Sequence, residues 1–429
     1  MAGLMIINAA EAVTLGGFSA EPARGPRQSE LGIIRDAAVF VRDGKIAAVG
    51  ASDRLRQEYR AEIDTLLDAE GGVVLPGFVD PHTHLVFAGD RADEWERRMQ
   101  GAEYLDILRS GGGILSTVKK TRAACEDALH TSARRWANAA ITCGTTTLEI
   151  KSGYCLDRDG EIKLLNVAQR LRDSLPIEIV STFLGAHVVP PEFKNDRPGY
   201  LDLVLKTAAT IRERSLAEFF DVFCEQEAFT LEETEMLCRK AQDLGYRIKL
   251  HAEQFSDSGA TRLGVRLGAL SVDHLEQISD DSIAALKSAE HPPLAVLLPA
   301  VAFHLALTTH APGRQLVDAG IPVALATDMN PGSSFTPSMP MAIAIACRTQ
   351  GLTVAEALVA ATINAAHALD RQDSVGSLEP GKRADIIVCD IPDYRHLAYG
   401  FGHNPVRAVI ANGQIVRNQG RVDPTASPH

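Results

Sequence analysis

Eight short apolar runs recur along the middle of the chain, and stretches with helical patterning separate them. Strands that alternate with helices build a parallel sheet, because each crossover helix carries the chain back to the starting end of the sheet. Eight such units close into a (β/α)₈ barrel. An open doubly wound sheet is the alternative, but no G-x-G-x-x-G sequence follows the first run. The runs are residues 72–80, 144–150, 177–185, 219–225, 246–253, 269–276, 293–300 and 321–328.

The connecting stretches carry helix signals of their own. Residues 126–142 and 230–245 show apolar side chains at helical spacing. The second stretch begins with Thr230 and has Glu233 three residues later, which is the pattern of a capping box. It ends at Gly245, and glycine often ends helices because it adopts left-handed backbone angles without strain. These signals indicate helices between the strands.

The two ends of the chain differ from the middle. Residues 37–50 and 406–420 each form two alternating apolar runs, with Asp43-Gly44 and Asn412-Gly413 between them, so each predicts a β-hairpin. Neither end has enough strands for a stable core of its own. We therefore expect an α/β protein: a (β/α)₈ TIM barrel with a small β-sandwich domain built from both termini. The expected bounds are 1–75 and 380–429 for the β-sandwich domain and 76–379 for the barrel.

Composition limits the partners. The chain has 429 residues and a net charge of −12, so it lacks the basic surplus of a general nucleic-acid binder, whereas a local basic pocket for an anionic small molecule is compatible with this charge. Its seven cysteines include no C-x-x-C pair, which fits a reducing cytoplasm. The first residues lack a basic segment, and no apolar run reaches about 18 residues, so we expect neither a signal peptide nor a membrane span.

Polar side chains follow six of the eight runs, at the end where a barrel carries its chemistry. His82 and His84 alternate along an extended backbone, so both imidazoles point the same way. Burying several histidines without partners is costly, and a divalent ion removes that cost by binding neutral imidazoles and a carboxylate. We predict metal ligation by His82, His84, His251 and Asp328, each with a hydrogen-bonding partner behind it. The strand-end residues are His82, His84, Lys151, Tyr154, His187, His251, His274 and Asp328.

Four motifs together resemble the amidohydrolase superfamily, and within it most closely the imidazolonepropionase family. They are GFVDPHTH at 77–84, KLHAE at 249–253, VDHLE at 272–276 and ALATDMNPGSS at 324–334. HTHLVFAGDRADEWERR, IKSGY and STFLGAHVVPPEF also resemble that family, and the similarity covers nearly the whole chain, the split β-domain included. A histidine pair alone is a weak signal, but this set of motifs is specific.

The resemblance implies hydrolysis of the cyclic amide 4-imidazolone-5-propanoate to N-formimidoyl-L-glutamate, a step of histidine degradation. It implies one mononuclear site, with Zn²⁺ or iron held by the four predicted ligands, and a homodimer as the assembly. It also implies a set of contacts to a small substrate that carries a carboxylate. These contacts are Arg91, Tyr154 and His187 for the substrate, and Asn330, Gly332 and Ser333 for the substrate or the product.

Each residue type suits a step of that reaction. Hydroxide formed from a metal-bound water, whose pKa the ion lowers to about 7, attacks the ring carbonyl, and Asp328 carries the proton to the leaving ring nitrogen. His274 orients the water or the carbonyl and stabilises the developing oxyanion. Arg91 offers a forked contact to the propanoate carboxylate. Gln254 can donate and accept hydrogen bonds at the ring amidine.

Two positions depart from the family pattern. Cys155 replaces a glycine that is common after the tyrosine, and Gln254 stands where some members and many related deaminases have glutamate. Glu253 lies beside it, but its side chain should point elsewhere. Lys151 is expected to form a salt bridge near the barrel mouth rather than to carry a carbamate between two metals. Residues 110–116, SGGGILS, are expected to form a lid, because no G-K-[ST] follows as in a phosphate-binding loop.

Two other functions stay open at this stage. A deaminase of the same superfamily would act on an aminated ring or on formimidoylglutamate, but Gln254 replaces the glutamate that such enzymes commonly use to move protons. A metal-binding protein without activity would be a structural or regulatory partner. The joint presence of Asp328, His274, Arg91 and Tyr154 disfavours that second alternative.

Overall fold

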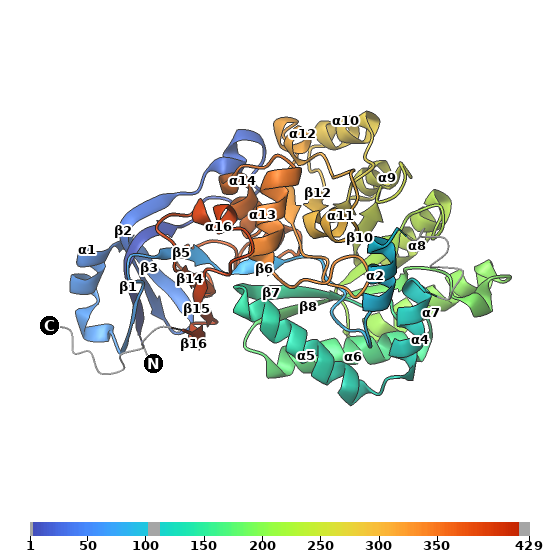
Figure 1. The fold of residues 1–429 in the computed structure, drawn as a ribbon, viewed down its shortest axis with the longest axis horizontal. Coiled ribbons are helices and arrows are strands. Elements are labelled where there is room, and N and C mark those ends of the chain that lie inside the picture. The colour runs from blue at the N-terminus through green and yellow to red at the C-terminus, as the bar shows by residue number, and fades with distance from the viewer. Residues whose placement is uncertain (1–2, 102–111, 420–429) are drawn as a thin grey trace.

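The computed structural model describes residues 3–101 and 112–419 and contains two eight-stranded sheets (Figure 1). In the first sheet every strand runs parallel to its neighbours, and the strands follow one another in chain order. A doubly wound sheet would reverse its order at a switch point, so the predicted (β/α)₈ barrel is confirmed. Its strands are β6 (Phe78–Asp80), β7 (Thr145–Lys151), β8 (Glu178–Ala186), β9 (Phe219–Phe223), β10 (Arg247–Ala252), β11 (Ser271–His274), β12 (Leu294–Leu297) and β13 (Val323–Leu325).

The two end strands of this sheet, β6 and β13, meet through the residues that follow them. Thr83 and Met329 form a parallel bridge. The amide of Asp328 donates to the carbonyl of His82, and the amide of His84 donates to the carbonyl of Met329, each over 3.0 Å. The barrel thus closes at the segments that carry three of the predicted metal ligands.

Helices surround the barrel, and apolar side chains from their inner faces join those of the strands in one large core (Figure 1). The predicted capping box is present: the Thr230 hydroxyl accepts the amide of Glu233, and the Glu233 carboxylate accepts the amide of Thr230. Gly245 follows this helix with a φ of 87°. The helices are α1 (Ser52–Glu58), α2 (Ala92–Met99), α4 (Ile114–Ala123), α5 (Glu126–Thr142), α6 (Arg158–Ser174), α7 (Arg197–Glu213), α8 (Leu231–Asp243), α9 (Ala260–Leu267), α10 (Asp280–Ser288), α11 (Pro299–His304), α12 (Gly313–Asp318), α13 (Met339–Thr349), α14 (Val354–Ala360), α15 (Ile363–His367) and α16 (His396–Tyr399), and short 3₁₀ helices span Gly25–Ser29, Arg60–Glu62 and Pro191–Phe193. Of the expected lid, residues 110 and 111 lie outside the described residues, and α4 begins at Ile114.

The second sheet joins both termini in one mixed layer, in the order β16–β15–β14–β5–β1–β2–β3 with β4 beside β1. β1 runs parallel to β4 and β5, and the other pairs are antiparallel. Both predicted hairpins are present, with positive φ at both turn residues, as such two-residue turns require. The strands are β1 (Leu4–Val13), β2 (Ile33–Arg42), β3 (Lys45–Ala51), β4 (Thr65–Asp68), β5 (Val73–Pro76), β14 (Ile386–Cys389), β15 (Val406–Ala411) and β16 (Gln414–Asn418).

The two hairpin turns bring distant parts of this sheet together. The amide of Ala384 donates to the carbonyl of Gly44 over 2.8 Å, and the amide of Gly413 donates to the carbonyl of Ala384 over 2.9 Å. Inner side chains from β1, β2, β14 and β15 form one buried cluster. The sheet therefore folds over a core of its own, which confirms the expected small β-domain built from both termini.

The apolar run 72–80 serves both sheets, which corrects its expected role as a barrel strand alone. β5 pairs with β1 and β14, whereas β6 pairs with β7. Gly77 stands between them and leaves no room for a side chain, because a Cβ there would lie 2.2 Å from Thr146 Oγ1. β5 ends at Pro76, one residue beyond the boundary placed at 75, and the division into domains is retained as our proposal.

Ion pairs at the amino-terminal end of β8 link the barrel to the segment that leads into the β-domain. The Glu178 carboxylate on β8 accepts hydrogen bonds from Arg371 and Arg383.

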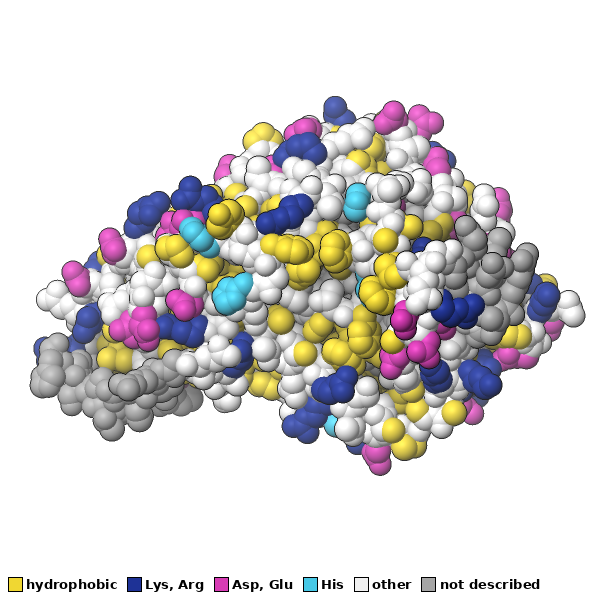
Figure 2. Space-filling view, in the orientation of Figure 1, with side chains coloured by type: hydrophobic (Ala, Val, Ile, Leu, Met, Phe, Trp, Pro, Cys, Tyr) yellow, Lys and Arg dark blue, Asp and Glu magenta, His cyan; other side chains and the backbone are white. Residues whose placement is uncertain are grey.

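Basic and acidic side chains are interspersed over the face of the molecule that Figure 2 shows. Among the described residues, no helix has both the length and the apolar character that a membrane crossing requires.

Candidate metal centre and active site

The four predicted metal ligands meet at the closed mouth of the barrel, and all four are almost completely buried. His82 Nε2 lies 3.3 Å from His84 Nε2, and His84 Nε2 lies 3.4 Å from His251 Nε2. Asp328 Oδ1 lies 3.5 Å from the Nε2 atoms of both His82 and His84. Three parts of the chain thus direct ligand atoms toward one point. The segment after β6 supplies two nitrogen atoms, β10 supplies one nitrogen atom, and the segment after β13 supplies one oxygen atom.

Carboxylates behind two of these histidines hold the opposite ring nitrogen. His82 Nδ1 hydrogen-bonds Asp273 Oδ2 over 2.6 Å, and His251 Nδ1 lies 3.0 Å from Asp221 Oδ2. A hydrogen bond at Nδ1 fixes the tautomer and leaves the Nε2 lone pair directed into the site. The third ring differs, because His84 Nδ1 is buried without a hydrogen bond and without a carboxylate beside it among the described residues.

The donor set fits a metal ion. Asp328 Oδ1 is buried and has no hydrogen-bond partner within the described part of the chain, although a buried carboxylate oxygen without a partner is costly. Burial holds the pKa of His82 and of His84 well below the ordinary value, so both imidazoles are neutral. Neutral imidazoles and a carboxylate are the ligands that zinc and related divalent ions take in proteins. These residues can therefore hold such an ion.

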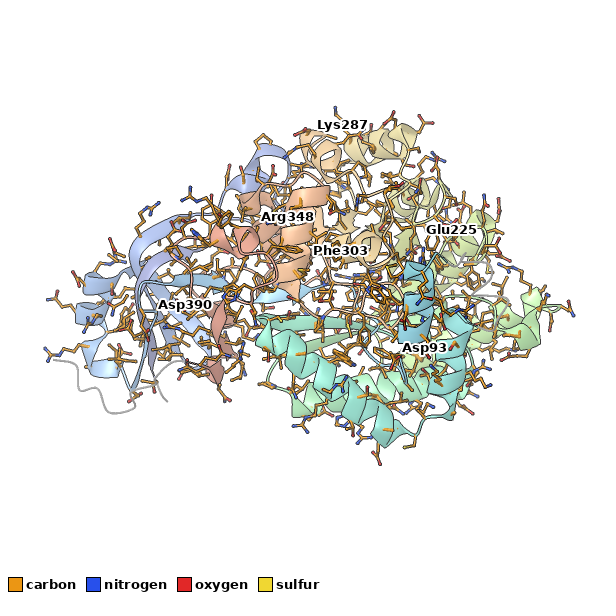
Figure 3. All side chains as sticks on the ribbon, viewed as in Figure 1. Asp93, Glu225, Lys287, Phe303, Arg348 and Asp390 are labelled. Atoms are coloured by element: carbon orange, nitrogen blue, oxygen red, sulfur yellow. The ribbon has the colours of Figure 1, made fainter. Side chains whose placement is uncertain are left out.

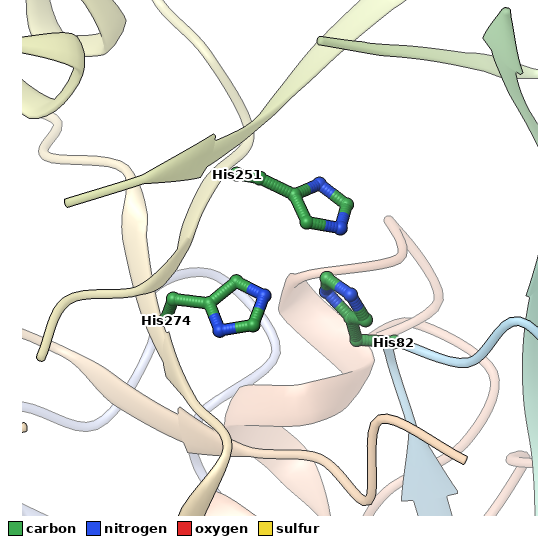
Figure 4. A group of neighbouring side chains, drawn as sticks. All are labelled: His82, His251 and His274. Atoms are coloured by element: carbon green, nitrogen blue, oxygen red, sulfur yellow. The ribbon is translucent and has the colours of Figure 1, made fainter. Parts of the chain in front are cut away.

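His274 lies as close to this centre as the predicted ligands do. Ligand atoms of His82, His251 and His274 lie within 4.8 Å of one another, as do those of His82, His84 and Asp328. Figure 4 shows the rings of His82, His251 and His274 turned toward one shared space. Burial acts against the charged form of His274, but the Glu276 carboxylate, 3.7 Å from its Nδ1, and Asp328 raise its pKa. A charged imidazole is a hydrogen-bond donor, which suits the predicted role outside the ligand set.

A tight turn holds Asp328, and three of the predicted substrate contacts build it. Asn330 Nδ2 donates to the carbonyl of Asp328 over 2.6 Å, and its Oδ1 accepts the amides of Gly332 and Ser333 over 2.8 Å each. Ser333 Oγ lies 3.4 Å from Asp328 Oδ2. Asp328 itself has a φ of 51°, which the turn must stabilise. Burial, the largest influence, raises the pKa of Asp328 to about 6.

Arg91, Tyr154 and His187 line the approach to this centre. The rings of Tyr154 and His187 lie 5.6 Å apart between centroids, and the His187 ring stacks 5.3 Å from that of His84. His187 Nδ1 donates to the carbonyl of Gly153 over 3.1 Å, which ties it to the Tyr154 loop. Arg91 hydrogen-bonds the Tyr154 side chain, and Arg91 Nε is buried without a partner among the described residues. Burial raises the pKa of the Tyr154 hydroxyl, so this hydroxyl keeps its proton and remains a hydrogen-bond donor at neutral pH.

Gln254 and Glu253 lie just past the end of β10 and differ in exposure. Glu253 is buried and turned toward α9, where its carboxylate accepts the amide of Thr261 over 3.0 Å. Gln254 is half-buried, and its side chain has no hydrogen-bond partner among the residues that the structure describes. The loop that carries it is held by Glu225, labelled in Figure 3, which accepts the amide of Phe255 over 3.0 Å. Gln254 is therefore free to contact a ligand, whereas Glu253 is engaged elsewhere.

The sequence analysis did not identify the carboxylates behind the histidines. Asp221 and Asp273 lie inside apolar strands, where charged side chains are rarely found without a partner, and this position was the available signal. Lys151 forms the predicted salt bridge, with Nζ 2.8 Å from Asp221 Oδ2. Its carboxylate partners are completely buried.

Comparisons with known proteins show which proteins this chain resembles. The family model described as Amidohydrolase family matches residues 73–416. The chain is 45% identical over 425 residues to an imidazolonepropionase of Geobacillus kaustophilus (strain HTA426), covering 98% of this chain and 100% of that protein. An imidazolonepropionase of Solibacter usitatus (strain Ellin6076) is 43% identical over 417 residues, covering 97% of this chain and 99% of that protein. Among solved structures, E. coli guanine deaminase shares the fold, with a TM-score of 0.72 at 16% identity over 98% of this chain and 100% of that one.

Proposed function

The chain belongs to the amidohydrolase family and, within it, to the imidazolonepropionases, and we propose that its buried histidine–aspartate cluster performs their hydrolysis. Water adds across a carbonyl C–N bond of 4-imidazolone-5-propanoate, the ring opens, and N-formimidoyl-L-glutamate forms, as in histidine degradation. The observation that carries this proposal is the similarity to imidazolonepropionases over the full length of both chains.

The proposed metal site holds one ion between His82, His84, His251 and Asp328, with Zn²⁺ or iron as the candidates. Three imidazoles and one carboxylate suit either metal. When bound, the ion supplies Lewis acidity and lowers the pKa of water at the site to about 7. The unpartnered Asp328 oxygen and the neutral imidazoles support this assignment.

Asp328 moves the proton in this proposal. Its carboxylate accepts a proton from the attacking water and returns it to the ring nitrogen that leaves. His274 donates a hydrogen bond to the carbonyl oxygen of the substrate and stabilises the negative charge that develops there.

The remaining predicted residues bind the substrate. The Arg91 guanidinium and the Tyr154 hydroxyl, which contact each other, receive the propanoate carboxylate, because a charge-assisted forked contact suits that anion. His187 hydrogen-bonds the ring, and Gln254 contacts the ring amidine with its free side-chain amide. Asn330, Gly332 and Ser333 act chiefly by holding Asp328, and Ser333 Oγ also faces the ligand space.

One assay tests this function. The purified chain, loaded with Zn²⁺ or with Fe²⁺, receives 4-imidazolone-5-propanoate, and mass spectrometry follows a product heavier by one water while ammonia is measured in the same tube. Gain of water without ammonia is the expected result. Release of ammonia would indicate the deaminase alternative, and a metal-loaded protein that turns over neither this substrate nor other cyclic amides would contradict the proposed activity.

We further propose a cytoplasmic homodimer. All seven cysteines are free, which suits a reducing compartment. Tyr399 and Phe401 at the end of α16 expose 78% and 49% of their surface, and such apolar side chains suit contact with a second copy. Light scattering that gives the mass of one chain at micromolar concentration would contradict the dimer.

A further inference from the structure

One buried lysine lies behind the candidate metal centre, and the proposed reaction does not use it. We propose that Lys151 is a positioning residue: its ammonium group holds the two carboxylates that orient the ligands His82 and His251. This inference rests on the proposed metal site and adds to it the lysine behind the carboxylates that contact the ligand rings. Lys151 is the last residue of β7 and is completely buried.

The Lys151 ammonium lies among three carboxylates from three strands. Nζ lies 2.8 Å from Asp221 Oδ2 on β9, 3.1 Å from Glu149 Oε2 on its own strand and 3.7 Å from Asp273 Oδ2 on β11. All three carboxylates are completely buried. At this depth each charge requires a partner, and Lys151 is the group that all three share.

Two of these carboxylates reach the metal ligands directly. Asp273 Oδ2, the atom nearest to Lys151, also bonds His82 Nδ1 over 2.6 Å. Asp221 Oδ2, the atom that accepts from Lys151, also lies 3.0 Å from His251 Nδ1. One ammonium group therefore sets the position of two oxygen atoms, and each oxygen sets the orientation of one ligand ring. A carbamate on Lys151 would add a negative charge among three others, so the structure favours the free amine.

A second buried lysine provides a natural comparison. Lys249 lies in β10 and is also completely buried. Its Nζ lies 3.4 Å from Glu149 Oε1 and donates to the carbonyls of Pro81 and Ala368 over 3.0 and 3.3 Å. Lys249 thus shares Glu149 with Lys151, but neither Asp221 nor Asp273 is among its ion-pair partners in the described part of the chain. Its loss should affect folding without releasing the carboxylates behind the ligands.

The test measures how firmly the site holds Co²⁺. Cobalt-loaded wild type, Lys151→Met and Lys249→Met are mixed with excess chelator, and the rate of cobalt loss and the visible spectrum are recorded beside thermal unfolding. We expect Lys151→Met to lose cobalt about 10-fold faster or more and to change the spectrum, since groups behind metal ligands typically change affinity by that factor. Lys249→Met should keep the wild-type spectrum and release rate even where it unfolds at a lower temperature.

A double variant separates positioning from charge balance. Lys151→Met with Glu149→Gln removes one positive and one negative charge together, so the net charge of the buried cluster stays the same, and it is the variant to measure if the single variant fails to fold. Fast cobalt loss in the double variant supports positioning, because Asp221 and Asp273 still lack their shared partner. Wild-type release from the double variant, or equal release from the two single lysine variants, would overturn the inference. A wild-type chain that binds no cobalt would instead contradict the proposed metal site.

Discussion

Gly332 lies directly against the guanidinium group of Arg91. A Cβ atom at position 332 would lie 1.7 Å from Arg91 Nη2 and 2.0 Å from Cζ, far closer than any non-bonded contact allows. Gly332 has an ordinary backbone φ, so glycine is needed here for space and not for conformation. The turn that holds Asp328 therefore also shapes the place where Arg91 lies.

Gly332→Ala should impair substrate binding because the methyl group displaces Arg91 from its place beside Tyr154. A charge-assisted hydrogen bond contributes roughly 1.5–3 kcal/mol, so we expect KM for 4-imidazolone-5-propanoate to rise about 10-fold or more. Steady-state kinetics measure this, with kcat affected less than KM. Gly16→Ala is the control, since Gly16 is exposed, has an ordinary φ and meets only the Glu379 side chain.

Arg91→Ala should raise KM in the same way, and the two changes should not add. The double variant should bind substrate no worse than Arg91→Ala alone, because the alanine at 332 then has no guanidinium to displace. Additive losses in this double-mutant cycle would mean that Gly332 acts on the substrate by another route. An unchanged KM in Arg91→Ala would contradict the proposed contact of this side chain with the substrate carboxylate.

Asp328→Asn should nearly abolish turnover. The amide keeps the volume of the side chain and the turn around it but cannot accept the proton, and loss of a general base typically costs about 10²–10⁴-fold in rate. The measurement is kcat at saturating metal, with metal content determined on the same sample. Asp318→Asn, on the exposed side of α12, is the matched control. Turnover near that of wild type in Asp328→Asn would rule out the proposed proton transfer.

Removal of metal should lower the melting temperature, because the buried imidazoles and Asp328 then lack their common partner. A ligand that binds only the folded state stabilises by about 2.7 kcal/mol at 100 times its dissociation constant. Calorimetry after chelation, and again after return of Zn²⁺, measures the effect. His84→Ala should abolish the response to added metal, whereas His291→Ala, whose side chain is 86% exposed, should retain it. Equal melting temperatures with and without metal would contradict a site at this place.

The sequence predicted the part of the site that follows the ends of the strands. His82, His84, His251 and Asp328 could be grouped because parallel strands present their carboxyl ends at one mouth, whatever the details of packing. Their partners could not be assigned, because which carboxylate lies behind which ring nitrogen depends on neighbouring strands and on side-chain direction. Asp273 on β11 thus bonds His82 after β6, across the interior of the barrel.

The sequence pattern also could not predict that the run 72–80 is divided between two sheets. Its residues are apolar throughout, and a continuous apolar run gives no sign of where pairing changes from one sheet to another. The structure places the change at Gly77, whose amide donates to the carbonyl of Asp385 over 2.9 Å. The next amide, that of Phe78, donates to the carbonyl of Gly144 over 2.9 Å, so the change of sheet depends on contacts with residues far away in the sequence.

Glu178 should make the protein sensitive to acid at the contact between the barrel and the segment before β14. Partial burial acts to raise its pKa, but Arg383 and Arg371 hold it below the ordinary value of 4.5. A carboxyl group with a lower pKa in the folded state stabilises fully above the unfolded-state pKa, and this contribution is lost as pH falls through the folded-state value. The loss therefore begins below about pH 4.5, the pKa of an unperturbed glutamate.

Glu178→Gln tests this prediction because it removes the charge and keeps the shape. Hydrogen bonds to charged groups contribute roughly 1.5–3 kcal/mol, so the variant should be less stable than wild type by about 2 kcal/mol at pH 7, with a smaller difference at pH 4. Urea unfolding at both pH values measures the two differences. Glu290→Gln is the control, since its side chain is 91% exposed, and it should leave stability unchanged at either pH. A stability difference for Glu178→Gln that stays constant between pH 7 and pH 4 would show that its charge does not contribute, and the arginine contacts would then act through packing alone.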